Sequence, residues 1–468
     1  MDNVLDDSLK AALERQRSAF QAEPFPSAAI RRDRIDRLRR LVKEQADAFC
    51  DAVAADFGNR SRHETTLLEI APLLAELRHA RSHLARWMRP RRRGSSLEFL
   101  QLSNWVQYQP LGVVGIMVPW NYPILLALGP LVDVLAAGNR AMIKPSELLP
   151  KTSALLAEVV PNYFSPAEVT VVQGGVEVAQ AFSGLPFDHL IFTGSTAVGK
   201  RVMAAAAQHL TPLTLELGGK SPCVIAPDYP IDAAARDIAF GKMMNAGQTC
   251  IAPDYVLVPR EKVQQLTEAL TARIRSLYPA GAQAGDYSSI IAERFQVRLE
   301  NAVEEARSRG AKIVTCEIDL SGGGFRFPPT LVIDPPDDCL LMQDEIFGPV
   351  LPIVPYDDIA QAVDLINRKD RPLALYLFTH DNTLEKRLLA GTISGNVTIN
   401  GTLLHIVQTD LPFGGVGPSG QGAYHGFDGF VRFSHARGIA KVRLFNPTIF
   451  ATPPFGTMAK WLARFMTR

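Results

Sequence analysis

The chain has 468 residues, with 49 lysines and arginines against 48 aspartates and glutamates, so its formal net charge is +1. This balance gives no support for a nucleic-acid-binding surface, which needs a clustered excess of basic residues. Hydrophobic residues make up 47% and charged residues 21% of the chain, which excludes disorder and is typical of a globular protein. At roughly 150 residues per domain, the length predicts two or three domains.

The five cysteines are scattered along the chain, at Cys50, Cys223, Cys250, Cys316 and Cys339. No CxxC pair or histidine-rich segment accompanies them, which argues against a disulfide framework and a structural zinc site, so we expect no metal. The first residues lack the basic and apolar segments of a secretory signal, and no run of about 20 apolar residues is present. We therefore expect a cytoplasmic protein without a spanning helix, in which one cysteine is available as a nucleophile.

In chain order, residues 7–93 carry apolar side chains at helical spacing, and residues 94–112 change to an extended pattern. From residue 112 onward, short β-rich runs alternate with helical segments, and a second alternating region begins near residue 211. This alternation predicts mostly parallel sheets with helices on both faces, which bind ligands at the carboxyl ends of their strands. The two regions predict an α/β fold with two lobes and a cleft between them.

A candidate phosphate contact lies between Phe192 and Gly199, where a predicted strand passes into a predicted helix. The turn contains Thr193, Gly194 and Ser195. Backbone N–H groups at a helix N-terminus attract phosphate, and glycines let a ligand approach the backbone. The spacing differs from GxGxxG, so a plain turn remains the alternative.

Four further side chains stand at or just after predicted strand or helix ends. Lys144 and Glu147 follow another strand at the same sheet edge, where they could hold ribose hydroxyls or form an exposed turn. Glu216 alternates with leucines and precedes two glycines, so it is a candidate base, with a solvated carboxylate as the alternative. Cys250 follows a helix, and its thiolate is a candidate nucleophile, although most cysteines are packing residues.

Seven short motifs carry a resemblance to a known family. In their order and spacing they resemble the aldehyde dehydrogenase superfamily, over nearly the whole chain. They are Pro119-Trp120-Asn121-Tyr122-Pro123, Lys144-Pro145-Ser146-Glu147, the turn from Thr193 to Gly199, Leu215-Glu216-Leu217-Gly218-Gly219-Lys220, Gly247-Gln248-Thr249-Cys250, Glu345-Ile346-Phe347-Gly348-Pro349 and Leu411-Pro412-Phe413-Gly414-Gly415-Val416-Gly417.

The chain is most similar to the shorter, class-3-like branch of this superfamily, and within it to the bacterial coniferyl aldehyde dehydrogenases. The resemblance implies two doubly wound Rossmann-like lobes with a small β bridging or oligomerisation element, and a homodimer. It implies an NAD(P)-binding domain at 1–93 and 113–217, a catalytic domain at 218–423, and the bridging element at 94–112 and 424–445. Residues 446–468 would form a C-terminal amphipathic tail.

The resemblance also implies a mechanism. Cys250 would attack the aldehyde carbon to form a thiohemiacetal, whose oxyanion is held by the Asn121 amide and the Cys250 backbone N–H. Hydride transfer to the nicotinamide would leave a thioester, which water activated by Glu216 hydrolyses. By the same resemblance, Lys144 and Glu147 hold the adenosine ribose.

Ser195, in the turn with Thr193, Gly194 and Gly199, would contact the pyrophosphate, and Glu345 with Phe347 would position the nicotinamide ribose. The carboxylate at position 216 favours water over coenzyme A as the acyl acceptor. The carboxylate at position 147 favours NAD, while the lysine at 144 leaves NADP open.

The substrate and the tail leave more than one interpretation. Trp120, Tyr122 and Phe413 are candidate aromatic walls for an aromatic aldehyde such as coniferaldehyde, or for a medium- or long-chain apolar aldehyde, with ordinary packing as the alternative. The basic, amphipathic tail could cover a partner subunit, cover the substrate entrance or lie on a membrane surface, as in a membrane-associated fatty-aldehyde dehydrogenase. A cysteine-dependent esterase without redox turnover, and a binding protein that has lost turnover, are the rival functions.

Overall fold

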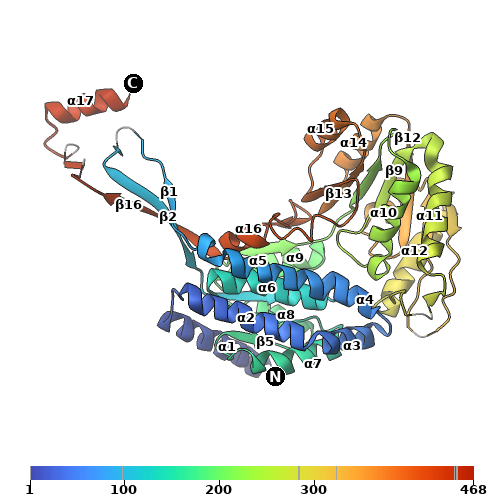
Figure 1. Cartoon of the computed structure of the whole chain (residues 1–468), viewed down its shortest axis with the longest axis horizontal. Helices are drawn as coiled ribbons and strands as arrows, with labels where there is room; N and C mark the ends of the chain where they lie inside the picture. The colour runs from blue at the N-terminus through green and yellow to red at the C-terminus, as the bar shows by residue number, and fades with distance from the viewer. Residues whose placement is uncertain are drawn as a thin grey trace.

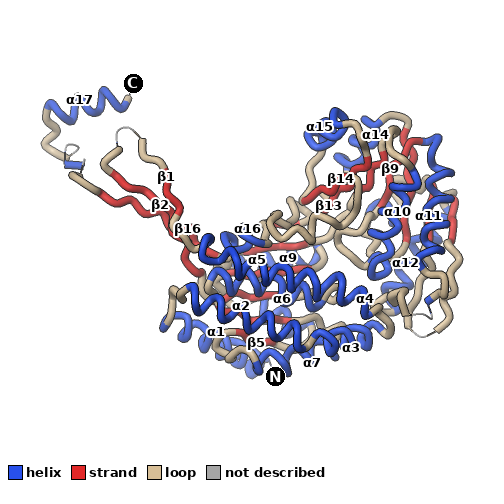
Figure 2. The backbone as a smooth tube through the Cα atoms, in the orientation of Figure 1, coloured by secondary structure: helices blue, strands red, loops and turns tan. Residues whose placement is uncertain are grey.

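The chain folds into two lobes and a projecting arm (Figure 1). A computed structural model describes residues 2–96, 99–282, 285–322, 324–446, 448–449 and 452–467. Of the predicted tail at 446–468, residues 447, 450, 451 and 468 lie outside the described residues. The described helices and strands alternate along both lobes, as the secondary-structure colouring in Figure 2 shows.

The first lobe is built on a six-stranded sheet. Its five longer strands are parallel to one another, and β15 pairs antiparallel to β7. Every residue of β3, β4 and β6 is buried, because helices cover both faces, which is the environment of a parallel sheet. In spatial order the strands are β15 (Gly420–Gln421), β7 (Leu213–Glu216), β6 (His189–Thr193), β3 (Val113–Met117), β4 (Arg140–Lys144) and β5 (Val169–Val171).

Alternating side chains of these strands pack into two separate hydrophobic cores. Val113 and Met117 pack on one face against α1, α8 and α9, while Val114 and Ile116 pack on the other against α6, which α2 and α5 cover. The helical segments of this lobe are α1 (Asp2–Ala22), α2 (Ala28–Glu44), α3 (Ala46–Phe57), α4 (Arg62–Thr65), η1 (Thr66–Ile70), α5 (Ala71–Trp87), α6 (Pro123–Ala137), α7 (Pro150–Val159), η3 (Val160–Asn162), α8 (Val176–Ser183) and α9 (Thr196–Ala207).

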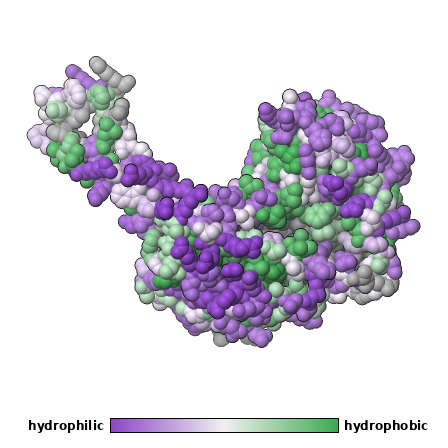
Figure 3. All heavy atoms as spheres, viewed as in Figure 1, coloured by the Kyte–Doolittle hydropathy of each residue, from purple (hydrophilic) through white to green (hydrophobic). Residues whose placement is uncertain are grey.

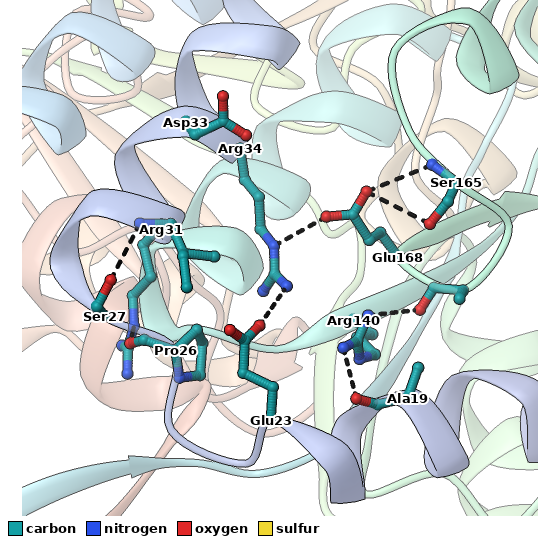
Figure 4. A network of polar contacts seen from close by, with 12 residues as sticks. Ala19, Glu23, Pro26, Ser27, Arg31, Asp33, Arg34, Arg140, Ser165 and Glu168 are labelled. Atoms are coloured by element: carbon teal, nitrogen blue, oxygen red, sulfur yellow. Dashed lines mark hydrogen bonds and ion pairs between the residues drawn. The ribbon is translucent and has the colours of Figure 1, made fainter.

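Buried arginines tie the N-terminal helices to the first sheet (Figure 4). Arg34 of α2 lies 3.1 Å from Glu168 and 3.2 Å from Glu23, and Arg140 of β4 donates to the Ala19 carbonyl at 2.6 Å. Burial favours the neutral form of Glu168, but its hydrogen bonds and charge contacts with arginines outweigh this and hold its pKa at about 2. The carboxylate is therefore ionised at neutral pH and anchors the α1–α2 corner.

The second lobe is built on a seven-stranded sheet that is parallel except for β10. Its strands in spatial order are β10 (Lys312–Thr315), β11 (Thr330–Ile333), β12 (Val350–Tyr356), β9 (Tyr255–Pro259), β8 (Pro222–Ile225), β13 (Ala374–Phe378) and β14 (Asn396–Ile399). Its helical segments are α10 (Ile231–Met243), η4 (Met244–Gly247), η5 (Arg260–Lys262), α11 (Val263–Leu277), α12 (Glu293–Ser308), α13 (Leu340–Gln343), α14 (Ile359–Arg368) and α15 (Asn382–Gly391).

The arm is a three-stranded antiparallel sheet with a helix at its end. It contains β1 (Arg91–Arg93), β2 (Leu102–Pro110), β16 (Ser434–Val442) and the terminal α17 (Thr457–Met466). The helical segment predicted to reach residue 93 ends at Trp87, and β1 begins after Pro90, which cannot continue a helix. Figure 3 shows hydrophobic residues on this arm and where the two lobes meet.

The predicted α/β fold of two Rossmann-like lobes is confirmed. Two short segments return from the second lobe to the first: β15 pairs with β7, and α16 (Gly426–Arg432) packs against α5 and α6. None of the described helices has both the length and the apolar character needed to cross a membrane.

Candidate active site

Glu216 ends β7 at the carboxyl edge of the first sheet, paired with Thr193 on one side and Gly420 on the other. Its side chain is almost fully buried, and neither carboxyl oxygen has a hydrogen-bond partner among the described residues. Burial raises the pKa of Glu216 well above its usual value, and the charge of Arg432 opposes this only in part. Burial thus favours the neutral form of a carboxyl group that has no protein partner among the described residues.

Cys250 lies at the end of a strained loop after α10. Asn245, Ala246 and Gly247 have φ angles of 51°, 51° and 74°, a conformation that only glycine adopts readily. A Cβ at position 247 would overlap with the carbonyl of Gly348, so a glycine is required there. This left-handed turn places Cys250 at a cavity wall rather than within a helix.

The side chain of Gln248 holds this loop in place. Its amide nitrogen donates to the carbonyls of Asn245 at 3.0 Å and Ser289 at 2.9 Å, and its oxygen accepts the Ile291 N–H at 3.0 Å. Because Gln248 is completely buried, these bonds are shielded from water. The backbone position of Cys250 is therefore fixed from both sides.

Asn121 reaches the same loop from the first lobe. Its side-chain nitrogen donates to the Gln248 backbone carbonyl at 3.1 Å. The backbone carbonyl of Asn121 accepts from Arg60 at 2.6 Å and from the side-chain amide of Asn245 at 3.1 Å. The neighbouring Tyr122 hydroxyl lies 2.7 Å from Thr249 Oγ1. The structure thus brings Asn121, Glu216 and Cys250 together, as the sequence predicts.

A second acidic group, Glu345, lies near Cys250. Burial raises the pKa of Glu345 to about 8, and its carboxyl oxygen Oε1 has no partner among the described residues. A Cβ at Gly218 would overlap with the other oxygen, so the absence of a side chain there lets the carboxyl group approach the strand end. Burial, Glu345 and Glu216 together raise the pKa of the Cys250 thiol, while backbone N–H groups oppose them.

Two cavities meet at Cys250. The first lies between the lobes, and its walls include most of the residues predicted to hold a dinucleotide. It is lined by Pro119, Trp120, Asn121, Thr193, Gly194, Ser195, Glu216, Leu217, Gly218, Cys250, Phe295, Arg298, Glu345 and Phe347.

The second cavity is mainly apolar and also reaches Cys250. Thr193, Glu216 and Cys250 line both cavities, so a ligand in either one reaches the same thiol and carboxyl group. The wall of the second cavity consists of Leu68, Pro72, Glu76, Tyr122, Leu125, Leu126, Thr193, Glu216, Phe240, Thr249, Cys250, Ile251, Leu373, Leu403, Leu404, Ile406, Val407, Phe413 and Tyr424.

Not every predicted site residue lies on the expected cavity. Tyr122 and Phe413 line the second cavity, but Trp120 lines the first, where its ring packs 5.3 Å from the ring of Phe347. Trp120 and Tyr122, two residues apart in the same loop, thus line different cavities. The structure therefore does not group Trp120 with the other two candidate substrate residues.

Lys144 and Glu147 lie outside the walls of both cavities. Lys144 ends β4 with its nitrogen 3.3 Å from Glu147 and 2.9 Å from the Pro145 carbonyl. Ser195 caps α9 by accepting the Val198 N–H at 3.4 Å, and Gly199 packs against Leu217 one turn into that helix. All four stand at the carboxyl edge of the first sheet or at the helix that follows it.

The first cavity fits a dinucleotide at its nicotinamide end. The unpartnered Oε1 of Glu345 is a free acceptor for a ribose hydroxyl, and Phe347 lines the same wall. The N-terminus of α9 opens toward the cavity at Ser195, which is the polarity that attracts phosphate. Phe295 and Arg298 of α12 also line it; no sequence motif had singled them out.

Sequence comparison decides the family. The model of the aldehyde dehydrogenase family matches residues 3–439. The chain belongs to the aldehyde dehydrogenase family. Its members oxidise aldehydes with a nicotinamide dinucleotide, and this is the activity of the chain; the comparisons do not favour the rival esterase.

Individual relatives cover most of the chain. A probable coniferyl aldehyde dehydrogenase of Pseudomonas aeruginosa is 47% identical over 96% of this aldehyde dehydrogenase and 94% of the relative. The coniferyl aldehyde dehydrogenase of Pseudomonas sp. strain HR199 is 45% identical over 92% and 90%. The dimeric, NADP-preferring aldehyde dehydrogenase of Rattus norvegicus is 38% identical over 94% and 96%.

Solved structures share the fold. A substrate-bound state of AldH from Staphylococcus aureus superposes with a TM-score of 0.91 at 33% identity, and covers 98% of this chain and 99% of its own. An aldehyde dehydrogenase of Mycobacterium tuberculosis complexed with NAD+ superposes with a TM-score of 0.84 at 29% identity, over 94% and 91%.

A buried ion pair that no motif revealed supports the loop of Asn121. Arg60 and Glu69 are fully buried, 3.2 Å apart, and Glu69 also accepts the backbone N–H groups of Ile124 and Leu125 at 2.8 and 3.1 Å. Because Arg60 also donates to the Asn121 carbonyl, the pair fixes the start of α6 and the loop before it.

Replacing Arg60 with methionine is expected to lower the free energy of unfolding by about 3–5 kcal/mol, because Glu69 is left buried without its counter-charge. Urea denaturation of the wild type and the variant measures this difference. The double variant Arg60→Met with Glu69→Gln removes the stranded charge and should recover part of the loss. A single variant as stable as the wild type would contradict a supporting role for the pair.

Proposed function

We propose that this aldehyde dehydrogenase oxidises aromatic aldehydes of the coniferaldehyde class to their carboxylic acids with NAD(P)+, as a cytoplasmic homodimer. The observation that carries the proposal is the meeting of two cavities at Cys250 and Glu216, with Asn121 on the wall of the first. One cavity fits a dinucleotide and the other is apolar, so the two reactants reach one thiol from opposite sides.

Cys250 is the proposed nucleophile. The sulfur attacks the aldehyde carbon and forms a thiohemiacetal, whose oxygen receives hydrogen bonds from the Asn121 amide and the Cys250 backbone N–H. Asn121 is prepared for this, because the Gln248 carbonyl already holds its nitrogen at 3.1 Å. The dinucleotide, when bound, supplies the hydride acceptor.

Glu216 is the proposed base for the second half of the reaction. Its free carboxyl oxygens face the two cavities, so it can take a proton from the water that attacks the thioester. The dinucleotide-holding roles are assigned by position: Glu345 and Phe347 for the nicotinamide ribose, and Ser195, at the α9 N-terminus, for the pyrophosphate. Lys144 and Glu147 are proposed for the adenosine ribose.

The apolar second cavity supports an aromatic substrate. Tyr122, Phe413 and Tyr424 line it, and their ring faces suit a flat aldehyde. Two of the relatives carry the name coniferyl aldehyde dehydrogenase. The arm, with exposed apolar residues such as Leu444, Trp461 and Phe465, is the proposed dimer contact.

The experiment is a kinetic panel on the purified chain. Coniferaldehyde, benzaldehyde and decanal are each offered with NAD+ and with NADP+, and the carboxylic acid is quantified by chromatography. We expect acid formation from all three and the highest kcat/KM with coniferaldehyde. A higher kcat/KM for decanal would overturn the aromatic substrate class, and acid formation from none of them would overturn the function.

A further inference from the structure

Glu76 is a carboxyl group in the otherwise apolar part of the second cavity. It lies on α5, and its side chain is only 10% exposed. The other titratable groups on this wall are Glu216 and Cys250, which belong to the reacting end, and the hydroxyls of Tyr122 and Tyr424. The mechanism assigns no task to Glu76.

No hydrogen bond to Glu76 occurs among the described residues. The nearest polar partner is Nε2 of His425, 3.6 Å from Oε1, which is beyond hydrogen-bond distance. On the other side, α6 passes close by: a Cβ at Gly129 would lie 3.4 Å from Oε2. A carboxyl group that is nine-tenths buried, faces a cavity and lacks a partner is unfavourable unless a ligand supplies one.

Burial favours the neutral forms of Glu76 and of the ionisable groups beside it. Burial, together with the nearby Asp133, raises the pKa of Glu76 well above its usual value. Burial also raises the pKa of Asp133 to about 8 and lowers the pKa of His425 to about 4. A neutral carboxyl group donates one hydrogen bond and accepts another, which matches the requirements of a hydroxyl group.

An aromatic wall connects Glu76 with the reacting end of the cavity. The ring of Tyr424 lies 6.2 Å from that of Phe413 and 4.6 Å from that of His425, both at steep angles. Phe413 in turn stacks on His425 at 5.5 Å. A flat substrate lying along this wall with its aldehyde at Cys250 directs its far end toward Glu76.

We propose that Glu76 binds a hydroxyl group on the substrate ring remote from the aldehyde, so that the cavity selects phenolic aldehydes over unsubstituted aromatic and straight-chain ones. The inference rests on the proposed function for its chemistry and adds to it the group that sets the substrate class. A site built to bind a hydroxyl group discriminates strongly against an analogue that lacks it, because the buried polar group is then left unpaired.

The kinetic test uses matched substrate pairs: 4-hydroxybenzaldehyde against benzaldehyde, and coniferaldehyde against its methyl ether, 3,4-dimethoxycinnamaldehyde. In Glu76→Leu, kcat/KM for the phenolic member of each pair should fall on the order of 10–100-fold, mainly through KM, while the other member changes by less than about 3-fold. Glu76→Gln, which still donates and accepts, should restore most of the preference. Equal effects on both members, or none on either, would overturn the proposal.

A binding experiment separates this inference from the proposed function. Guaiacol and its methyl ether, veratrole, carry no aldehyde, so their binding, measured by calorimetry, does not depend on turnover. The wild type should bind guaiacol at least about 10-fold more tightly than veratrole, and Glu76→Gln should keep that ratio. These measurements still test the proposal if Glu76→Leu fails to fold. Equal affinities in the wild type would overturn the role of Glu76 even if every aldehyde is oxidised. A preserved ratio in an enzyme that oxidises no aldehyde would leave the site standing and overturn only the function.

Discussion

Replacing Cys250 with alanine is expected to reduce aldehyde oxidation by a factor on the order of 10⁴ or more, because Cys250 is the only cysteine among the described residues that lines either cavity. The sulfur alone forms the bond to the substrate carbon, so the reduced dinucleotide should be absent even in the first turnover. Rapid mixing of enzyme, dinucleotide and aldehyde, followed at the absorbance of the reduced dinucleotide, measures this.

The matched control is Cys316→Ala. Cys316 is also buried and free but lies on neither cavity, so this variant should keep wild-type kcat and lose only some stability. A Cys250→Ala enzyme that still gives a full first turnover would remove the thiol from the mechanism.

The groups around Cys250 determine how the reactivity of its thiol depends on pH. Its thiol pKa is raised by burial and by the charges of Glu345 and Glu216, so the thiolate forms only at higher pH than in a free cysteine. Alkylation by iodoacetamide should therefore rise with pH beyond the range of a free thiol. In Glu345→Gln one of the opposing charges is gone, so alkylation at a given pH should be faster than in the wild type.

The reacting groups were predictable because each belongs to a short motif at the end of a strand or helix. Period-two alternation in β7 places Glu216 at the strand terminus, where the carboxyl ends of parallel strands meet. Asn121 and Cys250 follow β3 and α10, so the fold brings their loops to the same edge. The sequence pattern therefore predicts the two-lobed fold, while the grouping of these three residues is what the family resemblance implies.

The ion pair that supports the Asn121 loop and the carboxyl group proposed to select the substrate were not predictable from the sequence pattern. Arg60, Glu69 and Glu76 lie in a region rich in charged residues, where many charges face solvent, and no local signal marks the ones that turn inward. Their burial depends on α6, which comes later in the chain and packs against α5 and η1. The side chain of Trp120 points into the first cavity for the same kind of reason, since loop direction is set by tertiary packing.

Replacing Glu216 with glutamine is expected to separate the two halves of the reaction. The first half needs Cys250, Asn121 and the dinucleotide, so one equivalent of reduced dinucleotide per active site should still form rapidly. The second half needs a base for water, and an amide cannot accept that proton, so steady-state turnover should fall about 10²–10³-fold. Rapid mixing gives the burst, and steady-state assays of the same enzyme give the turnover.

The pH profile assigns the effect to the carboxyl group itself. Because burial raises the pKa of Glu216 well above its usual value, the group is protonated and inactive as a base below that pKa, and turnover limited by hydrolysis should rise as pH increases through it. The glutamine variant should lack this rise. Glu345→Gln is the matched control: Glu345 lines only the first cavity, so its loss should raise the KM for the dinucleotide and leave the hydrolysis limb in place. Wild-type turnover in Glu216→Gln would contradict the role of Glu216 as the base for hydrolysis. Loss of the burst together with turnover would contradict it as well, because the two halves of the reaction would not have been separated.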